Sequence, residues 1–268
     1  SKWHNNSLRN YFGLSRNQNL KEYKIDLYNE FSEKPKKEII RIINKGLKIA
    51  EEKWNNIIED EENITLLELK EYYNSLSFPM GISSLPKHTN NLGKAYRMLG
   101  PLMINNLSNI NNVFDFGGNV GRELILIESN CQVENYLLIE EGETLLEYAQ
   151  WRDEKFDFNK VNYIKTSELK NQILQYEDEF DFGICYEVLE HLFDVEEAIE
   201  IMAKLLRKGG ILYQSTSFGL YPHPSHLKKN TKYAGKEDEL MAKFGFEKLE
   251  IDGLPLPLLL KKRFYRKI

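Results

Sequence analysis

The hydrophobic pattern divides the chain into two parts. From about residue 19 to 75, apolar residues recur three or four positions apart among charged residues, which is typical of amphipathic helices. A further helix is expected over 64–76, with Thr65 as its N-terminal cap, and another over 94–107. The segment 77–93 is rich in Pro, Gly, Ser and Asn, so we expect a loop there.

After about residue 108 the pattern changes to short apolar strands that alternate with helices. Strands are expected at 112–116, 136–140, 161–165, 180–186, 210–216, 246–252 and 258–267. Helices are expected at 121–129, 144–150, 167–176 and 195–207. Such alternation predicts a parallel sheet that is covered on both faces. Only GLPLP, 253–257, separates the last two strands, so they are expected to form an antiparallel hairpin at the sheet edge.

Composition and charge narrow the class of protein. The 268 residues are 41% hydrophobic and 29% charged, as in ordinary soluble globular proteins, and the net charge of -5 gives no electrostatic case for binding nucleic acid. The two cysteines, Cys131 and Cys185, form neither a zinc-ligand pair nor a disulfide framework. The first ten residues lack the apolar core of a signal peptide, and the longest apolar run, 254–260, is too short to cross a bilayer. We expect a cytoplasmic protein that acts on neither nucleic acid nor membranes.

The stretch VFDFGGNVG, 113–121, ends the first predicted strand in an acid and a glycine-rich turn. Ligands of open α/β sheets bind beyond the carboxyl ends of the strands. A dinucleotide fingerprint would need glycine at Phe116, and no Gly-Lys-Ser or Gly-Lys-Thr of a phosphate loop follows. Asp115 would repel a pyrophosphate and attract an ammonium or sulfonium group. The turn therefore favours a ligand with a cationic end, which the glycines let the backbone approach.

Three further motifs follow in order. Glu140 ends the second predicted strand, nineteen residues beyond Gly121, where a carboxylate can accept the two ribose hydroxyls of an adenosine. Glu141 is the adjacent alternative. The fourth strand runs into an acidic turn within FDFGICYEVLEHLFD, 180–194, and LLRKGGILY, 205–213, leads into the fifth strand.

These four motifs, in this order and spacing, resemble those of the class I S-adenosylmethionine-dependent methyltransferases over about residues 110–268. The resemblance implies an α/β fold, with a Rossmann-like seven-stranded, mostly parallel sheet and an antiparallel C-terminal hairpin, at 108–268. The N-terminal helical region at 1–107 is then expected to cap the pocket or to form an oligomer interface, such as that of a homodimer.

The resemblance also implies S-adenosyl-L-methionine as the cofactor and a set of residues that contact it. Those expected to contact the methionine part, the ribose, and the adenine and methyl group are, in this order, Asp115, Gly117, Gly118, Asn119 and Gly121; Glu140; and Thr166, Ser167, Cys185, Tyr186 and Glu187. Asn119 stands where an alternating glycine pattern would place glycine, and asparagine tolerates a left-handed backbone better than most residues.

Three histidines are candidates for the general base that removes a proton from the acceptor. His191 follows the fourth strand, while His223 and His226 belong to the loop after the fifth strand, where this fold lines its acceptor pocket. The alternative interpretation of each is structural, as a histidine that hydrogen-bonds backbone or lies in a surface loop. Trp54, Tyr72 and Tyr73, at helical spacing, are interpreted as packing residues and not as a substrate cage.

The predicted reaction is methylation of a small-molecule hydroxyl, of a sugar or a surface-polysaccharide precursor or substituent. CYEVLEH, 185–191, stands where enzymes of this superfamily that methylate amino groups carry Asn/Asp-Pro-Pro-Tyr/Phe. Asp and Asn metal ligands are not evident after the fourth strand, so no metal is expected. Two alternatives remain at this point: a protein or lipid acceptor, or a non-catalytic cofactor-binding partner.

Overall fold

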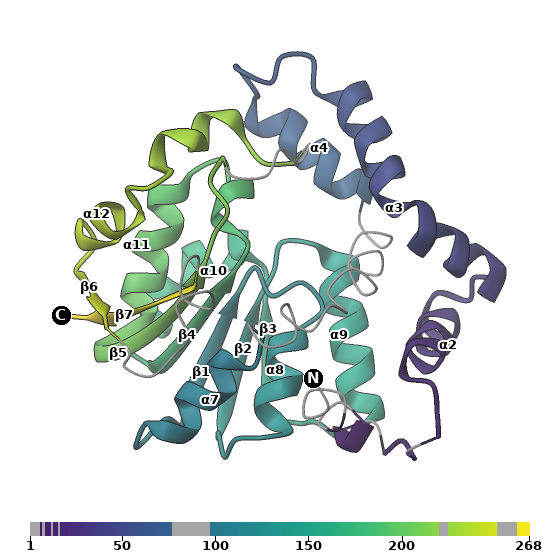
Figure 1. The fold of residues 1–268 in the computed structure, drawn as a ribbon, viewed down its shortest axis with the longest axis horizontal. Coiled ribbons are helices and arrows are strands. Elements are labelled where there is room, and N and C mark those ends of the chain that lie inside the picture. The colour runs from purple at the N-terminus through teal and green to yellow at the C-terminus, as the bar shows by residue number, and fades with distance from the viewer. Residues whose placement is uncertain are drawn as a thin grey trace.

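The computed structural model holds a seven-stranded sheet in the order β3-β2-β1-β4-β5-β7-β6 (Figure 1). The structure describes residues 6, 9–11, 13–15, 17–76, 97–219, 225–250 and 262–268. The strands are β1 (Asn112–Phe116), β2 (Asn135–Ile139), β3 (Val161–Ile164), β4 (Phe180–Tyr186), β5 (Leu206–Ser215), β6 (Phe246–Leu249) and β7 (Lys262–Lys267). The first five are parallel, while β7 pairs antiparallel with both β5 and β6. The predicted fold class, including the reversed hairpin, is confirmed.

Helices cover both faces of the sheet because apolar side chains point alternately to either side of its buried strands. Val113 packs in one hydrophobic cluster and its neighbour Phe114 in another. The cluster of Val113 is shared with α7 (Leu99–Asn106), α8 (Arg122–Glu128) and α9 (Glu143–Lys155). The cluster of Phe114 is shared with α10 (Thr166–Gln172), α11 (Val195–Leu205) and α12 (Glu237–Ala242).

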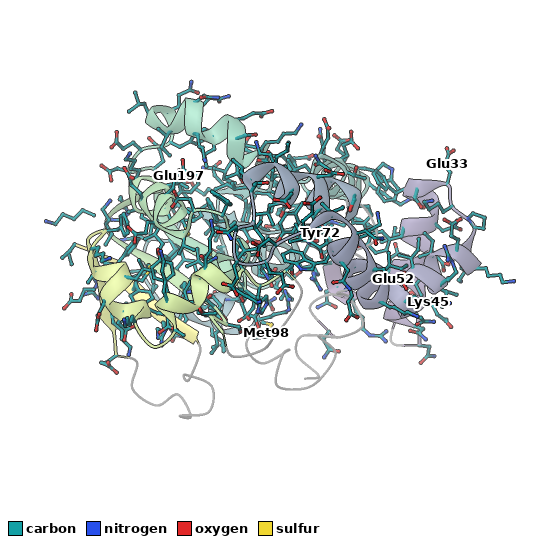
Figure 2. The ribbon with its side chains drawn as sticks, turned by 90° about the horizontal axis from the view of Figure 1, so that it is seen from above. Glu33, Lys45, Glu52, Tyr72, Met98 and Glu197 are labelled. Carbon is teal, nitrogen blue, oxygen red and sulfur yellow. The ribbon has the colours of Figure 1, made fainter. Side chains whose placement is uncertain are left out.

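The N-terminal helical region contains α2 (Leu20–Ser32), α3 (Lys36–Ile57) and α4 (Leu66–Leu76). The predicted cap at Thr65 is confirmed: its hydroxyl accepts from the backbone N–H of Glu68, and its own N–H donates to the Glu68 carboxylate at 2.8 Å. Figure 2 shows Tyr72 of α4 among the packed side chains, and Lys45 of α3 at the rim.

These three helices arch from α9 to the segment after β5 (Figure 1). At one end, Tyr28 of α2 stacks on Tyr148 of α9 with ring centroids 4.5 Å apart. At the other, Leu227 belongs to the same hydrophobic cluster as Trp54 and Tyr72. The N-terminal helices are thus packed against the strand-and-helix part of the chain at two separate places.

Several boundaries differ from the sequence expectation. The helix expected over 195–207 ends at Leu205, and β5 begins at Leu206, because Leu206 pairs with Phe180 of β4. A short 3-10 helix (Lys228–Tyr233) and α12 follow β5 where no helix was predicted. Two others are formed by Ile173–Gln175 and Leu189–His191. The predicted loop at 77–93 and the whole segment 251–261 lie outside the described residues, as does His223.

No helix in the described ranges combines the length and apolar character that crossing a membrane requires.

Candidate active site

In the glycine turn after β1, every second residue has a left-handed backbone, although one of these residues is not glycine. Gly117, Asn119 and Gly121 have φ values of 67°, 55° and 66°, all in the left-handed region. Asn119 therefore adopts the conformation for which a glycine would be expected, as predicted from its tolerance of positive φ. Gly118 is required for a different reason, since a Cβ there would lie 2.5 Å from Oδ2 of Asp115.

Asp115 is almost completely enclosed at the end of β1. Its side chain is 1% exposed, and its Oδ2 atom has no hydrogen-bond partner among the residues that the structure describes. Burial raises the pKa of Asp115 to about 7, against the opposing charge of Arg97. A buried carboxylate oxygen without a partner is costly, so its position fits a group that binds a cationic ligand.

Glu140 follows β2 and is turned toward the glycine turn. One oxygen accepts from the backbone N–H of Asn119 at 2.9 Å, and the other accepts from Glu141 and Gly142, both at 3.0 Å. Burial raises the pKa of Glu140 despite these hydrogen bonds. The Glu141 carboxylate points elsewhere and accepts from the backbone N–H of Ser167 at 3.0 Å, at the start of α10. Glu140 therefore bonds to the turn after β1, and Glu141 bonds to the start of α10 after β3, where the expected cofactor residues Thr166 and Ser167 lie.

The end of β4 contributes residues of different kinds. Cys185 is fully buried in the hydrophobic core, and burial raises the pKa of its thiol well above its usual value. The guanidinium of Arg97 lies 5.0 Å from the ring centroid of Tyr186. Glu187 has a φ of 54° and accepts hydrogen bonds from the hydroxyls of Ser215 and Ser217. The Cys185 side chain therefore packs in the core, Tyr186 lies between a hydrophobic cluster and the Arg97 guanidinium, and Glu187 lies among hydroxyl groups.

Glu190 is a buried acid that the sequence interpretation did not single out. It is 1% exposed and accepts from the Thr216 hydroxyl at 2.9 Å and from the Ser217 backbone N–H at 3.1 Å. Burial, and then the charge of Glu187, raise the pKa of Glu190. Thr216 and Ser217 follow β5 directly, so the Glu190 carboxylate lies at the ends of β4 and β5.

Two of the three predicted histidines come together beside Glu190. The rings of His191 and His226 are 4.6 Å apart and inclined at 72°. The backbone carbonyl of Ser225 lies 2.9 Å from Nδ1 of His191 and can only accept, so this nitrogen donates. The structural alternative for His191, a hydrogen bond to backbone, is therefore correct for one of its ring nitrogens. The same ring also lies beside His226.

A family model described as "Methyltransferase domain" matches residues 18–250. A search of curated proteins returned no match. The chain belongs to the class I S-adenosylmethionine-dependent methyltransferases. This membership confirms the expected cofactor, S-adenosyl-L-methionine, and the family match includes the N-terminal helices α2 to α4.

Solved methyltransferase structures share the fold at low sequence identity. The carbon methyltransferase of CurJ aligns with a TM-score of 0.52 and 17% identity over 72% of this chain and 60% of its own. A geranyl diphosphate methyltransferase in complex with GPP and sinefungin aligns with a TM-score of 0.52 and 10% identity over 73% of this chain and 82% of its own. This methyltransferase therefore spans less than two thirds of the CurJ chain.

The N-terminal helices of this methyltransferase reach the site through Tyr73. The residue as a whole is 37% exposed, but its side chain makes a hydrogen bond with that of Ser225, and burial of the phenol raises its pKa. The charges of Tyr72, Glu140 and Glu190 also raise the pKa of this phenol. The packing interpretation holds for Trp54 and Tyr72, whose rings meet edge to face at 4.9 Å. Tyr73 also packs, with its ring centroid 5.3 Å from that of Tyr72, while its hydroxyl bonds to Ser225.

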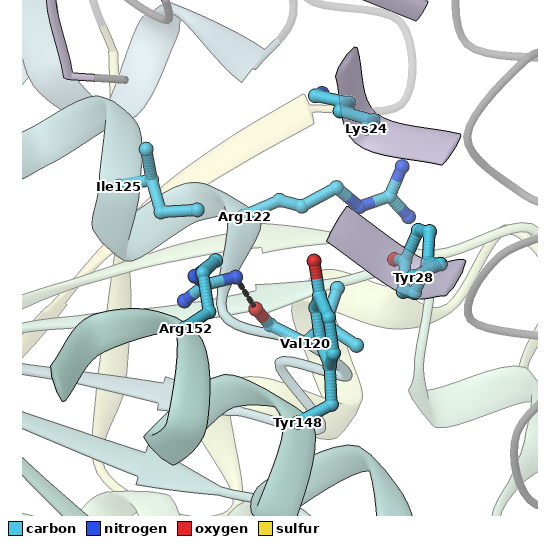
Figure 3. Close-up of a pocket in the computed structure, with 7 residues that line it drawn as sticks. All are labelled: Lys24, Tyr28, Val120, Arg122, Ile125, Tyr148 and Arg152. Carbon is cyan, nitrogen blue, oxygen red and sulfur yellow. Dashed lines mark hydrogen bonds between the residues drawn. The ribbon is translucent and has the colours of Figure 1, made fainter. Parts of the chain in front are cut away.

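A cationic pocket lies beside the glycine turn (Figure 3). Its lining residues are Lys24, Tyr28, Val120, Arg122, Ile125, Tyr148 and Arg152. The charge of Arg152 is balanced by Asp153 at 2.7 Å. Burial, and then the charge of Arg122, lower the pKa of Lys24 to about 7, while burial and Arg97 lower that of Arg122 to about 9. Such a concentration of positive charge suits a carboxylate or phosphate ligand.

The sequence interpretation missed the residues that come from the N-terminal part of the chain. Lys24, Tyr73 and Arg97 belong to amphipathic segments, where a basic or aromatic residue carries no local sign of a site. Their positions depend on how the helices pack over the strand ends, which no spacing in the sequence encodes. Glu190 could have been noticed, because it lies directly before His191 in the quoted fourth-strand motif.

Proposed function

We propose that this methyltransferase moves a methyl group from S-adenosyl-L-methionine to a hydroxyl of a small-molecule acceptor, a sugar or a surface-polysaccharide precursor or substituent. The observation that carries the proposal is the pairing of His191 with His226, 4.6 Å apart beside the ends of β4 and β5. A hydroxyl must lose its proton during the transfer, and imidazole is the side chain best suited to assist at neutral pH.

The cofactor would lie along the strand ends with its charged end at the glycine turn. Asp115 would attract its ammonium, and the cations Lys24 and Arg122 its carboxylate. Glu140 would accept the ribose hydroxyls, exchanging part of its backbone hydrogen bonding for them. The backbone around Thr166, Ser167, Cys185, Tyr186 and Glu187 would border the adenine and the methyl group.

The methyl transfer is an in-line displacement at carbon. The acceptor oxygen bonds to the methyl group as the carbon–sulfur bond breaks, and the sulfonium becomes a neutral thioether. Catalysis therefore requires a pocket that aligns the two atoms and helps the proton leave. In the simplest scheme, one imidazole of the His191 and His226 pair takes the proton. His223, three residues before His226 in the sequence, is the remaining candidate.

The polar character of the acceptor region supports a carbohydrate. Carboxylates, hydroxyls and imidazoles are concentrated at Glu187, Glu190, His191, Ser217 and His226. Several donors and acceptors at one place suit a molecule with several hydroxyls. We further propose that residues 1–107 cap the domain at 108–268, which the approach of Tyr73 to Ser225 supports.

A coupled assay for S-adenosylhomocysteine, run over a panel of sugar nucleotides and saccharide fragments, tests the proposal. We expect turnover on a hydroxylated sugar, and we expect His191→Ala and His226→Ala to lower kcat by about 100-fold or more with cofactor affinity retained. Normal turnover in both variants would refute the role of the pair. Turnover confined to protein or lipid acceptors would refute the carbohydrate assignment.

A cytoplasmic location and a homodimer complete the proposal. The two thiols, Cys131 and Cys185, form no disulfide, which supports a reducing compartment. Light scattering on the purified chain tests the dimer: a mass near twice 31.6 kDa is expected, and a mass near 31.6 kDa would refute it.

A further inference from the structure

We propose that Glu190, His191 and His226 bind one divalent transition-metal ion. Each of these residues offers a ligand atom, and these three atoms all lie within 4.8 Å of one another. Ligands that share an ion at about 2.1 Å lie about 3–3.5 Å apart, so a small contraction would complete the coordination. The binding of the ion stands on this geometry alone, whereas its part in catalysis rests on the proposed function.

The fold brings the three ligands together from two elements. Glu190 and His191 end the short 3-10 helix after β4, and His226 belongs to the segment after β5. The backbone N–H of Leu227, next to His226, donates to the carbonyl of Glu190 at 3.0 Å and joins the two elements. Asn230 also ties them, because its side-chain amide donates to the carbonyl of Leu192 at 2.8 Å. The ligands are thus held on hydrogen-bonded backbone.

The surroundings of the ligands are those of a metal site. Nδ1 of His191 donates to the Ser225 carbonyl at 2.9 Å, which fixes the orientation of the ring. In the neutral tautomer with its proton on Nδ1, Nε2 is the nitrogen that can bind a metal. The Glu190 carboxylate is oriented by the Thr216 hydroxyl and by the Ser217 backbone N–H. Metal-bound imidazoles and carboxylates are ordinarily oriented by such additional hydrogen bonds.

The charge balance of the cluster points the same way. Glu190 is 1% exposed, and the carboxylate of Glu187 acts on it electrostatically. Within the described ranges, the ion pairs of buried acids are made by other residues: Glu123, Asp153, Asp181 and Glu237. A divalent ion would offset the repulsion between the Glu190 and Glu187 carboxylates.

The ligand types indicate which ions fit. Two imidazoles with one carboxylate are typical of Mn²⁺, Fe²⁺ and Zn²⁺ sites, whereas Mg²⁺ and Ca²⁺ prefer sites made of oxygen atoms. Bound at this place, the ion would take the acceptor hydroxyl in an open coordination position and lower its pKa. The hydroxyl proton would then pass to solvent, and the oxygen would attack the methyl carbon as the carbon–sulfur bond breaks. With the ion bound, His191 and His226 would act on the acceptor through it, in place of the direct proton transfer to an imidazole in the simplest scheme.

Calorimetric titration of the chelator-treated full chain with MnCl₂ and with ZnCl₂ tests the site. We expect one ion per chain, and we expect Glu190→Gln and His226→Ala each to weaken its binding at least about tenfold. Glu134→Gln, at an exposed acid before β2, is the matched control and should bind as the wild type does. Titration of every variant with S-adenosylhomocysteine verifies that it is folded. No stoichiometric binding, or binding that His226→Ala leaves unchanged, would overturn the proposal.

A second measurement separates this inference from the proposed function. With an accepted substrate, turnover should be lost after chelation and restored by Mn²⁺ or Zn²⁺, and His226→Ala should require a higher concentration of the ion. Turnover that persists unchanged without the ion would overturn its catalytic part and leave methyl transfer by a histidine base. If no hydroxylated acceptor is methylated, the proposed function fails, and the calorimetry still decides whether the ion binds.

Discussion

The Glu140 carboxylate accepts a hydrogen bond from the backbone N–H of Asn119 at 2.9 Å. This contact joins the ends of β2 and β1, the two strand ends at which we place the cofactor. It also explains how a turn with asparagine in place of glycine keeps its shape, because the carboxylate holds the left-handed residue in place. The acid proposed to bind ribose therefore also supports the turn proposed to approach the methionine part.

Replacing this acid should weaken binding of the whole adenosine part of the cofactor. We expect Glu140→Gln to lower the affinity for S-adenosylhomocysteine and for 5'-methylthioadenosine by about tenfold or more, because charge-assisted hydrogen bonds to the ribose are lost. Glu141→Gln is the control, since the Glu141 side chain points to Ser167. If calorimetry finds equal cofactor affinity in the two variants, Glu140 is not the acid that binds the ribose.

Asp115→Asn should weaken cofactor binding in a manner that depends on pH. The pKa of Asp115 is raised to about 7, so its carboxylate attracts an ammonium above that pH and is neutral below it. The ratio of wild-type to variant affinity should be largest near pH 8 and approach one below about pH 6. Lys24 also has a pKa of about 7, but it titrates in both proteins, so its effect on affinity cancels in the ratio. A ratio that is constant with pH would contradict the assignment.

The same substitution should stabilise the cofactor-free protein. A carboxylate whose pKa is raised on folding destabilises the folded state above its ordinary pKa of 3.8, and the cost grows until pH reaches about 7. Asp115→Asn should therefore raise the free energy of unfolding by on the order of 2–4 kcal/mol at pH 8 and by little at pH 4. Urea denaturation at both values measures this, and a less stable variant at pH 8 would show that Asp115 is a structural acid.

The cationic pocket should discriminate between ligands that carry the methionine part and those that do not. We expect Lys24→Met to reduce affinity for S-adenosylhomocysteine several-fold and to leave affinity for 5'-methylthioadenosine, which lacks the carboxylate, unchanged. Lys45→Met, on the exposed side of α3, provides the control. Equal losses for both ligands would mean that Lys24 supports the fold and not the carboxylate.

The N-terminal helices should unfold together with the sheet. Tyr148 is 3% exposed, stacks on Tyr28, and meets Phe31 edge to face at 5.2 Å. Tyr148→Ala should cost about 3–5 kcal/mol and lower the midpoint of one cooperative thermal transition. Leu67→Ala, at a side chain that is 76% exposed, should change the stability by less than about 0.5 kcal/mol. Two separate transitions in calorimetry would show that the helices form an independent unit.

Local patterns were enough to predict the fold and the glycine turn. The alternation of apolar strands and helices after residue 108 predicted the parallel sheet, and the absence of a helix before the last strand predicted its reversal. Boundaries were less certain where one element passes directly into the next. Leu205 ends a helix and Leu206 begins a strand, and only the pairing of Leu206 with Phe180 decides between the two.

The chemistry at the site was only partly predictable, for a physical reason. Asp115 and Glu140 end strands, so the sheet places them without further information. The pairing of His191 with His226 depends on how the loop after β5 folds back over the end of β4, which is settled by contacts such as the hydrogen bond from Leu227 to Glu190. Tyr73 and Lys24 depend on the packing of α2 to α4 across the strand ends.

The most direct test of the central claim is calorimetric titration of the wild-type chain, Asp115→Asn and Glu140→Gln with S-adenosyl-L-methionine at pH 8. We expect one cofactor per chain in the wild type, with affinity reduced about tenfold or more in each variant while the fold is retained. Absence of binding to the wild type, or equal affinity in all three proteins, would contradict a cofactor site at the glycine turn.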